Sequence, residues 1–573
     1  MKYLLKNFCL IFLLLTNILF INNKSFAVDK KIIYTKDNIS NYLSGIISAN
    51  QDYTSAAFKY LSKAETIRSA HSHFNEQYIR TLVLLEKFDK AFLFSKDLLK
   101  EGNSVFEANL LLGIDSFVKG NYSDAEKYFS NLDRISGYNI FFEDLIGDIL
   151  IVWVKAAQKN KNASFEFLDK FPDRYENLKK IQKSFLNCYF NTPQTENVFR
   201  KLIQDKEINF SRYSFFLSNY LIYKNKNHEA KQLIFDTGKL YNENLLIKQT
   251  EDFILKKEVK KIKKLFNCEN PKDVIAEIFY ILANLYATEN DYQLSNFYLK
   301  ISFFLNKKFT PNKTLLAENL YYLKQYELSK KVYKSLQQIG YIYSWYSAKS
   351  VAAITSRIKD KKSSITVLEK EFESFSNPSV KHYYELANFY KDNGYFKKSI
   401  EYYSLALKKI KKDHHLFPKI LDRRGTSYER IGKWEQAEKD LMESLKISPN
   451  SPHVLNYLAY SWVEKKINIQ KALQMLEQAT ELKKNDGYII DSLGWAHYMN
   501  KNYISAEKFL QRAVELKPLD PIINDHYADT LWMLQKNIQA RYVWKHVLNL
   551  EETEEKLKKE IKNKLIFGVT SKL

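Results

Sequence analysis

The residues best suited to metal chemistry in this chain are its histidines, and two pairs of them lie close together. His71 and His73 are separated by one residue, and His414 and His415 are adjacent. A metal site needs several ligands that converge on one point, so either pair would require further histidine or carboxylate partners. We interpret both pairs as surface histidines in helix linkers, and we predict no metal site.

Sequence signatures of catalysis are missing as well. The chain contains no G-x-x-x-x-G-K-S/T, G-x-G-x-x-G, G-x-S-x-G or H-E-x-x-H motif. Its acids are numerous but scattered at helix-surface spacing, which gives no support to a carboxylate pair acting as general acid and base. We therefore predict a binding protein without a cofactor, and not an enzyme.

Two cysteines lie outside the apolar N-terminal segment that contains Cys9. Cys188 and Cys268 would be able to form a disulfide in an oxidising compartment. Nothing in the sequence fixes their geometry, and our expectation is two buried thiols.

The elements that would position any binding residue come from a repeated unit of 34 or 35 residues. In the last four units, a small residue follows the first apolar positions at steps of 34, 35 and 34 residues. An alanine follows 12 or 13 residues later, a large apolar residue four beyond it, and a smaller residue three further on. The four sets are Gly425, Ala437, Leu441, Ser444; Ala459, Ala472, Leu476, Ala479; Gly494, Ala506, Leu510, Ala513; and Ala528, Ala540, Trp544, Val547.

This spacing fits a pair of antiparallel helices. Two helices of about 12–14 residues and two short turns fill about 34 residues. Small residues let the helices cross closely, and the large residue fills the gap between neighbouring units. Pro449 and Pro518 would end two of the second helices. The pattern over 418–550 resembles the tetratricopeptide repeat (TPR), which implies an all-α solenoid, a superhelix of antiparallel helix pairs.

Looser copies of the pattern continue upstream, and the small residues that mark them are Gly45, Gly113, Ala283, Ala317 and Ala387. Weak units near 75–100, 145–170 and 210–240 are interpreted as degenerate helix pairs. We expect five segments: a signal peptide over 1–27, divergent TPR-like repeats over 28–255, middle TPR-like repeats over 256–417, well-formed repeats over 418–550, and a capping helix and tail over 551–573.

The capping helix is expected because an array of stacked units needs a polar end. Leu557, Ile561 and Leu565 lie four residues apart and form one apolar stripe, with acids before it and lysines around it. A helix lying on a membrane surface is the alternative interpretation of this segment.

Composition and charge support a folded, helical chain. Of 573 residues 45% are apolar, with only 14 glycines and 10 prolines. The net charge is +22, yet residues 418–550 hold 19 Lys/Arg against 16 Asp/Glu, a net of +3. We interpret the excess as solvated lysines on helix faces and expect no nucleic-acid partner. A nucleic-acid or polyanion binder that uses the basic N-terminal half is the alternative.

The N-terminus has the layout of an export signal. Lys2 and Lys6 precede an apolar core over 8–21, and the small residues Ser25 and Ala27 then mark a cleavage site. An uncleaved anchor is the alternative, although the core is short for a membrane span. No later segment has the pattern of a transmembrane helix. The sequence predicts an exported, periplasmic protein, peripheral to the outer membrane if it is membrane-associated at all.

The TPR resemblance also implies a binding groove along the first helix of each pair. In that family, side chains three before, one after and four after the small residue face the concave surface. A lysine, arginine and asparagine clamp for a C-terminal carboxylate is not reproduced here, since only Asn456 matches it. We predict groove residues that suit a partner with apolar and basic character: Asn456, Tyr460, Asp491, Trp495, Tyr498, Asp525, Asp529 and Trp532.

Other roles remain open for these residues. Trp495 and Tyr498 have the spacing of packing residues within the array, and Asp491 and Asp525 have a residue type common at helix N-caps. Trp495, Tyr498 and Trp532 would also serve as stacking platforms in a glycan- or peptidoglycan-binding protein, which is a further alternative.

The C-terminal repeats carry a more specific resemblance. "NYLAYSWVEKKINIQKALQMLEQA" and "GYIIDSLGWAHYMN" are similar to repeats of proteobacterial envelope TPR proteins. Some members of that group are outer-membrane lipoproteins that act as adaptors and deliver cell-wall hydrolases to a protease. The resemblance implies an adaptor whose partner is an envelope protease or a cell-wall enzyme. This chain lacks the cysteine that anchors those lipoproteins.

Overall fold

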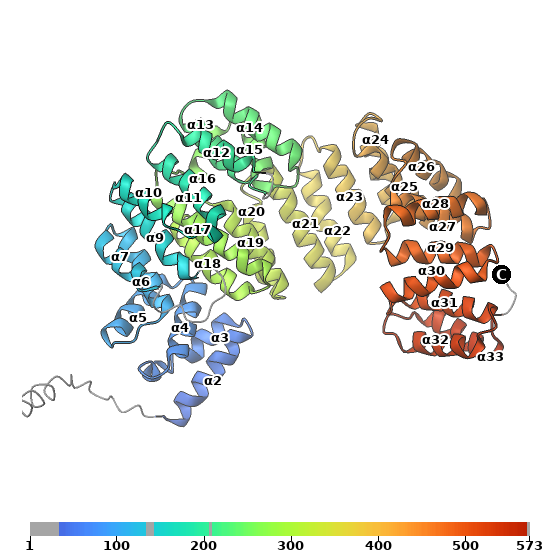
Figure 1. Cartoon of the computed structure of the whole chain (residues 1–573), viewed down its shortest axis with the longest axis horizontal. Helices are drawn as coiled ribbons and strands as arrows, with labels where there is room; N and C mark the ends of the chain where they lie inside the picture. The colour runs from blue at the N-terminus through green and yellow to red at the C-terminus, as the bar shows by residue number, and fades with distance from the viewer. Residues whose placement is uncertain (1–33, 133–142, 206–208, 570–573) are drawn as a thin grey trace, which may run out of the picture. The chain divides into compact units, whose positions relative to one another are not determined.

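The computed structural model describes residues 34–132, 143–205 and 209–569, and within these ranges the chain is helical with no strand (Figure 1). The predicted all-α solenoid of antiparallel helix pairs is confirmed. The signal peptide expected over 1–27 lies outside the described residues. No helix in the described ranges is both long and apolar enough to cross a membrane.

The chain divides into two compact units, which we call unit 1 (Met1–Ile354) and unit 2 (Thr355–Leu573). The division falls within the long helix α21 (Tyr341–Ile358). The boundaries that the sequence predicts after residues 255 and 417 stay predictions, and near them α15 packs on α16 and α24 packs on α25.

Unit 1 begins with hairpins and continues through the segments that the sequence marked as weak. Its elements before α21 are α2 (Lys36–Asn50), α3 (Thr54–Leu61), the 3₁₀ turn η1 (Glu65–Ile67), α4 (Ser72–Leu84), α5 (Phe88–Lys100), α6 (Phe106–Val118), α7 (Tyr122–Ser130), α9 (Glu143–Ala157), α10 (Lys161–Asp169), the 3₁₀ turn η2 (Asp173–Tyr175), α11 (Glu176–Tyr189), α12 (Thr195–Ile203), α13 (Tyr213–Tyr223), α14 (Asn227–Leu240), α15 (Leu245–Leu255), α16 (Val259–Leu265), α17 (Pro271–Thr288), α18 (Tyr292–Leu305), α19 (Thr310–Tyr322) and α20 (Tyr326–Leu336).

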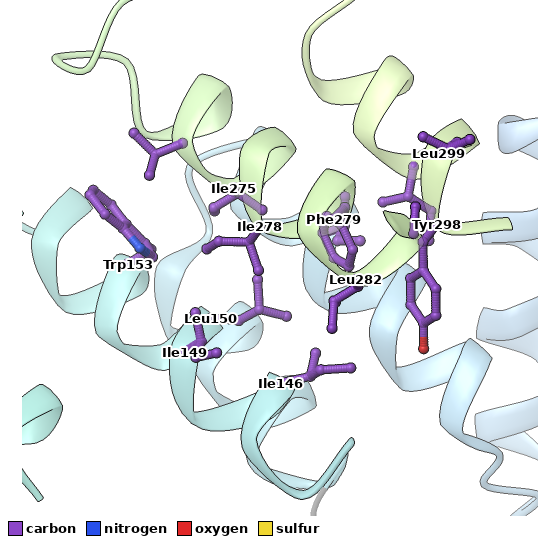
Figure 2. Packing of buried hydrophobic residues seen from close by; sticks show 14 of the residues in the cluster. Ile146, Ile149, Leu150, Trp153, Ile275, Ile278, Phe279, Leu282, Tyr298 and Leu299 are labelled. Carbon is purple, nitrogen blue, oxygen red and sulfur yellow. The ribbon is translucent and has the colours of Figure 1, made fainter. Parts of the chain in front are cut away.

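Helices that are far apart in sequence pack together in the interior of unit 1. Figure 2 shows Ile146, Leu150 and Trp153 of α9 facing Ile278 and its neighbours on α17. Trp153 is fully buried, and its indole Nε1 donates a 2.8 Å hydrogen bond to Oε1 of Gln182. This face of α9 is thus covered by α17.

A second long-range seam joins the first hairpins of unit 1 to α18 and α20. The amide of Gln293 donates to the carbonyl oxygens of Ala49 and Asn50, at 3.0 and 3.3 Å. The amide of Gln325 donates to the carbonyl oxygen of Asp52 at 2.8 Å. Beside these contacts, the Phe88 and Phe304 rings of α5 and α18 stack with centroids 4.4 Å apart. Unit 1 is therefore closed on itself.

The two cysteines of unit 1 differ from our expectation, because they form a disulfide. Cys188 near the end of α11 is bonded to Cys268, which lies between α16 and α17, with Cα atoms 5.9 Å apart. Both residues are buried, as expected, but the ring of Phe185 on α11 contacts the ring of Phe266, with centroids 5.7 Å apart, and this contact holds the segment that contains Cys268 beside α11. Two buried free thiols was the wrong prediction.

Unit 2 is a series of regular hairpins. After α21 it contains α22 (Lys361–Glu373), α23 (Val380–Asp392), α24 (Phe396–Lys408), α25 (Phe417–Arg430), α26 (Trp434–Ile447), α27 (Pro452–Glu464), α28 (Ile469–Leu482), α29 (Gly487–Met499), α30 (Tyr503–Leu516), α31 (Pro521–Met533), α32 (Asn537–Asn549) and α33 (Glu555–Phe567).

The predicted small-and-large pairs explain how these hairpins close. A Cβ placed on Gly494 of α29 would lie 2.6 Å from Cγ of Leu510 on α30, so only glycine permits this crossing distance. Leu510 and Ala506 are fully buried, as are their counterparts in the other three C-terminal units. In the α17–α18 pair of unit 1, Ser295 takes the place of the second-helix alanine. Its hydroxyl donates to the carbonyl oxygen of Ala283 at 2.6 Å.

The C-terminal capping helix is confirmed as α33. Its stripe residue Ile561 is fully buried and Leu557 is nearly so, both against residues of α31 and α32. This packing uses the apolar stripe inside the array, which argues against the alternative of a helix lying on a membrane surface.

Candidate functional site

The predicted groove residues lie on the first helices α27, α29 and α31, at the register expected for a TPR groove. Five of the eight are nonetheless buried, with side chains that contact the next helix of the array: Asp491, Trp495, Tyr498, Asp525 and Asp529. The other three are half-buried: Asn456, Tyr460 and Trp532. Whether any of them binds a partner stays a prediction.

Trp495 is at the centre of a stacked cluster between α29 and α31. Its ring lies parallel to those of Tyr498 and His526, with centroids 4.5 and 4.0 Å away. Its Nε1 donates to Oε1 of Glu464 on α27 at 2.7 Å. Trp495 is 7% exposed. Trp495 therefore packs within the array, which is one of the two roles that its spacing allows. Little of its ring remains exposed for stacking on a glycan.

An ion pair accompanies the stack. Nδ1 of His526 lies 3.0 Å from Oδ1 of Asp491, and both side chains are buried. Burial of the imidazole disfavours its charge, but the carboxylates of Asp491, Asp525 and Asp529 outweigh this and raise the pKa of His526. The pair fixes the spacing of two successive first helices.

A second buried cluster joins α31 to the capping helix. Nζ of Lys564 donates to Asp525 Oδ2 and to Asp529 Oδ2, both at 2.8 Å. The indole Nε1 of Trp544 donates to the same two carboxylates at 3.1 Å each. Burial and then repulsion from Asp525 raise the pKa of Asp529 to about 7, against the opposing effect of Lys564. The acids that we assigned to a groove are therefore satisfied within the array.

The N-cap alternative for Asp491 and Asp525 is wrong. The N-cap of α29 is Asp486, which accepts a hydrogen bond from the Tyr488 amide, and the N-cap of α31 is Asp520. Asp491 and Asp525 lie about one turn further on, where their side chains face the following helix.

Among the predicted groove residues, the half-buried Asn456, Tyr460 and Trp532 have the most accessible surface. Oδ1 of Asn456 is buried and has no hydrogen-bond partner, and Tyr460 is partly exposed one turn away. The Trp532 ring is in contact with the backbone of Gly568 and with the Arg541 guanidinium, whose centre is 5.1 Å from the ring centroid. Asn456 and Tyr460 are thus the predicted residues most available to a partner.

Sequence reasoning missed the two cations that neutralise the buried acids. His526 comes two residues before the small residue Ala528, and Lys564 comes one residue before the stripe residue Leu565. A third basic residue, His453, has its Nδ1 3.3 Å from Oδ2 of Asp422 and comes six residues before the small residue Ala459. The basic residues therefore share no single register position, and the repeat pattern gave no signal for them.

Asp422 differs from the other acids of this row because only one of its oxygens has a partner. It lies three residues before Gly425, the register of Asp491 and Asp525, and it is 8% exposed. Its Oδ1 is buried without a hydrogen-bond partner. A cavity of about 380 Å³ adjoins it, between the start of α25, the end of α26 and the start of α27.

The histidine pairs show no third ligand. The rings of His414 and His415 stack with centroids 4.5 Å apart, and His73 lies 3.5 Å from a Glu76 oxygen. Within the described part of the chain, no group of three or more His, Cys, Asp or Glu residues is placed to hold a metal ion.

Comparison with known proteins shows which repeat family this architecture is similar to. A family model for the tetratricopeptide repeat matches residues 381–408, which span α23 and α24. A TPR repeat-containing protein of Pseudomonas aeruginosa is 28% identical over 99 residues, which are 17% of this chain and 17% of that protein. The matched part is therefore less than a fifth of the relative's length.

The solved structures that match this chain share little of its sequence. MamA from Desulfovibrio magneticus is 19% identical, and the match covers 32% of this chain and 99% of MamA with a TM-score of 0.28. The Cut9–Hcn1 hetero-tetramer of the APC/C contains a chain that is 12% identical over 93% of this chain and 97% of its own, with a TM-score of 0.37. The repeat match at 381–408, the curated relative and the stacked hairpins agree that the chain contains tetratricopeptide repeats.

Proposed function

We propose that this TPR protein is an exported scaffold that binds partner proteins through the first helices of unit 2 and has no catalytic role of its own. The TPR fold in general supports protein interaction by presenting a row of aligned helices. Repeats that contact mainly their neighbours leave that row accessible, whereas packing between distant helices covers it. This difference between the two units is the observation that carries the proposal.

The contacts of unit 2 fit an accessible row. Its strongly packed helix pairs are those adjacent in sequence, together with contacts between successive first helices such as α27 with α29 and α29 with α31. In unit 1, by contrast, α9 packs on α17 and α4 packs on α18. Asn456 and Tyr460 of α27 remain partly exposed on the row, and we propose them as partner contacts.

The proposed partner is a protein segment with apolar and basic side chains. Carboxylates line the row on α25 and α27, including half-exposed Glu429 and exposed Glu464. A basic residue would be attracted by these acids, and an apolar one would cover the ring of Tyr460.

Export is the proposed location, on the basis of the N-terminal signal layout and the disulfide of Cys188 with Cys268. Disulfides persist in oxidising compartments such as the periplasm. In that compartment we propose an adaptor role toward an envelope protease or a cell-wall enzyme, as the similarity of the C-terminal repeats suggests. Mass spectrometry of the mature N-terminus tests this point, and we expect it to begin at Val28.

A pull-down from envelope extract tests the scaffold function. We expect wild type to recover a defined set of partners and Tyr460→Ala to lose most of it, because the substitution removes the partly exposed ring of Tyr460 from the row. Tyr542→Ala is the matched control, since Tyr542 is 76% exposed on the second helix α32 and lies away from the row. Recovery of the same proteins by wild type and Tyr460→Ala would contradict the proposed surface.

A further inference from the structure

A cavity lies beside Asp422 in unit 2. It has a volume of about 380 Å³, which is in the range of small-ligand sites. Its lining includes Ser448, Asn450 and Ser451, all from the loop that joins α26 to α27, and Oδ1 of Asn450 accepts a 3.0 Å hydrogen bond from the Gln478 amide. Ser451 is the N-cap of α27, yet its side chain makes no capping hydrogen bond. The cavity thus combines a carboxylate with hydroxyl and amide groups.

The incomplete pairing of Asp422 is what distinguishes this cavity from the other clusters in the row. Asp491 is bonded through both oxygens to His526, and Asp525 is bonded to Lys564 and Trp544. At Asp422, His453 reaches only Oδ2, and Oδ1 is buried with no donor. The Asp422 carboxylate thus has a single partner, so a cation placed beside it in the cavity would be stabilised.

We propose that this cavity binds a basic side chain, the ammonium of a lysine or the guanidinium of an arginine, from a protein segment docked on unit 2. The cation pairs with the carboxylate of Asp422, and the hydroxyl oxygens of Ser448 and Ser451 accept its remaining N–H groups. Arginine fits this arrangement best because its planar guanidinium offers five donors in a fixed geometry. The proposal rests on the proposed function, and it specifies the basic anchor of the partner.

The positive groups near the cavity do not displace such a ligand. Burial, and then the neighbouring His414 and Lys419, lower the pKa of His415, which favours the neutral form of its ring. Lys419 is exposed and has a long side chain that can extend into solvent. His453 is already held at Oδ2, and its side chain is 54% exposed.

Saturation-transfer NMR on the full chain tests the proposal with a small probe. We expect N-acetyl-arginine amide to receive saturation from wild type, and its neutral isostere N-acetyl-citrulline amide to receive little. Asp422→Asn keeps the shape of the side chain and removes its charge, so arginine binding should weaken by about ten-fold, as expected for a hydrogen bond to a charged group. Glu435→Gln, an exposed acid on α26, is the matched control and should leave binding unchanged.

A second variant guards against misfolding of Asp422→Asn. Asn450→Arg places a basic side chain in the cavity from the loop itself and should block the probe while Asp422 is intact. Equal arginine signals for wild type and Asp422→Asn, or equal signals for citrulline and arginine, would overturn the proposal. Stronger binding of N-acetyl-glutamate amide would overturn it in favour of an anion site. Because the assay needs no partner, its failure is separable from failure of the pull-down.

Discussion

Units 1 and 2 are built from the same kind of helix pair but use its inner face in opposite ways. In unit 1, α9 packs on α17 and the first hairpins bond to α18 and α20, so that helices more than 100 residues apart share a core. In unit 2, the strongly packed helices are neighbours or successive first helices. A helix pair therefore does not determine by itself whether a TPR face is open to a partner; the contacts made further along the chain decide this.

The largest expected effect is a loss of stability when a buried tryptophan is replaced, and it can be compared between the two units. Trp153→Ala should destabilise unit 1 by about 4 kcal/mol, because it leaves a large cavity and removes the partner of Gln182. Hydrogen exchange should rise both in α9 and in α17, which is more than 100 residues away in sequence. Trp462→Ala in unit 2 is the matched variant, since Trp462 is 2% exposed and bonds to Glu438. Its exchange increase should stay within α26, α27 and α28, and equal spread in both variants would remove the distinction.

Reduction of the disulfide should weaken unit 1 alone. The Cys188–Cys268 bond closes a loop with a sequence separation of 80, and its loss should cost about 3 kcal/mol. Urea unfolding with and without dithiothreitol, followed by exchange of each unit separately, measures this difference. Cys188→Ser with Cys268→Ser should reproduce the reduced state and should no longer respond to dithiothreitol. A reduction that destabilised unit 2 by as much would show that the units are not independent.

Removal of the cation beneath the capping helix should affect only the end of unit 2. Lys564→Met keeps the apolar length of the side chain but leaves Asp525 and Asp529 with Trp544 as their remaining donor. We expect a loss of about 2 kcal/mol, less than for a fully buried pair, because Asp529 can take up a proton. Exchange should increase in α31, α32 and α33 and stay unchanged in α25. Lys556→Met, at an 87% exposed side chain of α33, is the control.

The smallest effect is a difference in pH dependence between the units. Burial raises the pKa of Asp529 to about 7, so the folded chain holds a proton that the unfolded chain releases, and stability falls as pH rises from about 4 to 7. The raised pKa of His526 acts in the same direction, since its contribution is lost as pH rises through that value. In unit 1, burial raises the pKa of Glu277 to about 6, so the corresponding loss ends near pH 6.

Unfolding of each unit at pH 6 and pH 8 measures this difference. Unit 2 should lose about 1 kcal/mol between the two values, and Asp529→Asn should remove much of that loss. Glu435→Gln serves again as the control, because its carboxylate is exposed. An unchanged slope in Asp529→Asn would assign the pH dependence to other groups.

Much of the fold follows from the spacing of small and large residues. Gly494, Ala506 and Leu510 predict both helices of a pair and their crossing, and the same set reappears in the structure of every C-terminal unit. This success has a local cause, because the contacts in question lie within about 16 residues of one another. The disulfide and the seam at Gln293 could not be predicted in this way, since nothing near either residue specifies a partner so far along the chain.

The predicted site residues lie on the first helices, as their register indicates, but the register did not indicate what surrounds them. The side chains of Asp491 and Trp495 lie on the expected face of α29. The family register does not say how much of that face the next helix covers, and here His526 and Lys564 reach into it. Asn456 and Tyr460 keep partial exposure, and the free oxygen of Asp422 required coordinates to be found.

The seam at Gln293 and Gln325 also constrains the order in which the chain can acquire its structure. The carbonyl groups of Ala49, Asn50 and Asp52 receive these hydrogen bonds from residues 243 to 273 positions later. While the chain emerges from the ribosome or a translocon, its first hairpins therefore lack these hydrogen bonds and stay exposed. They can pack fully only after α18 and α20 have been synthesised. Newly made unit 1 should accordingly depend on holding chaperones, whereas unit 2 can assemble one hairpin at a time as it is released.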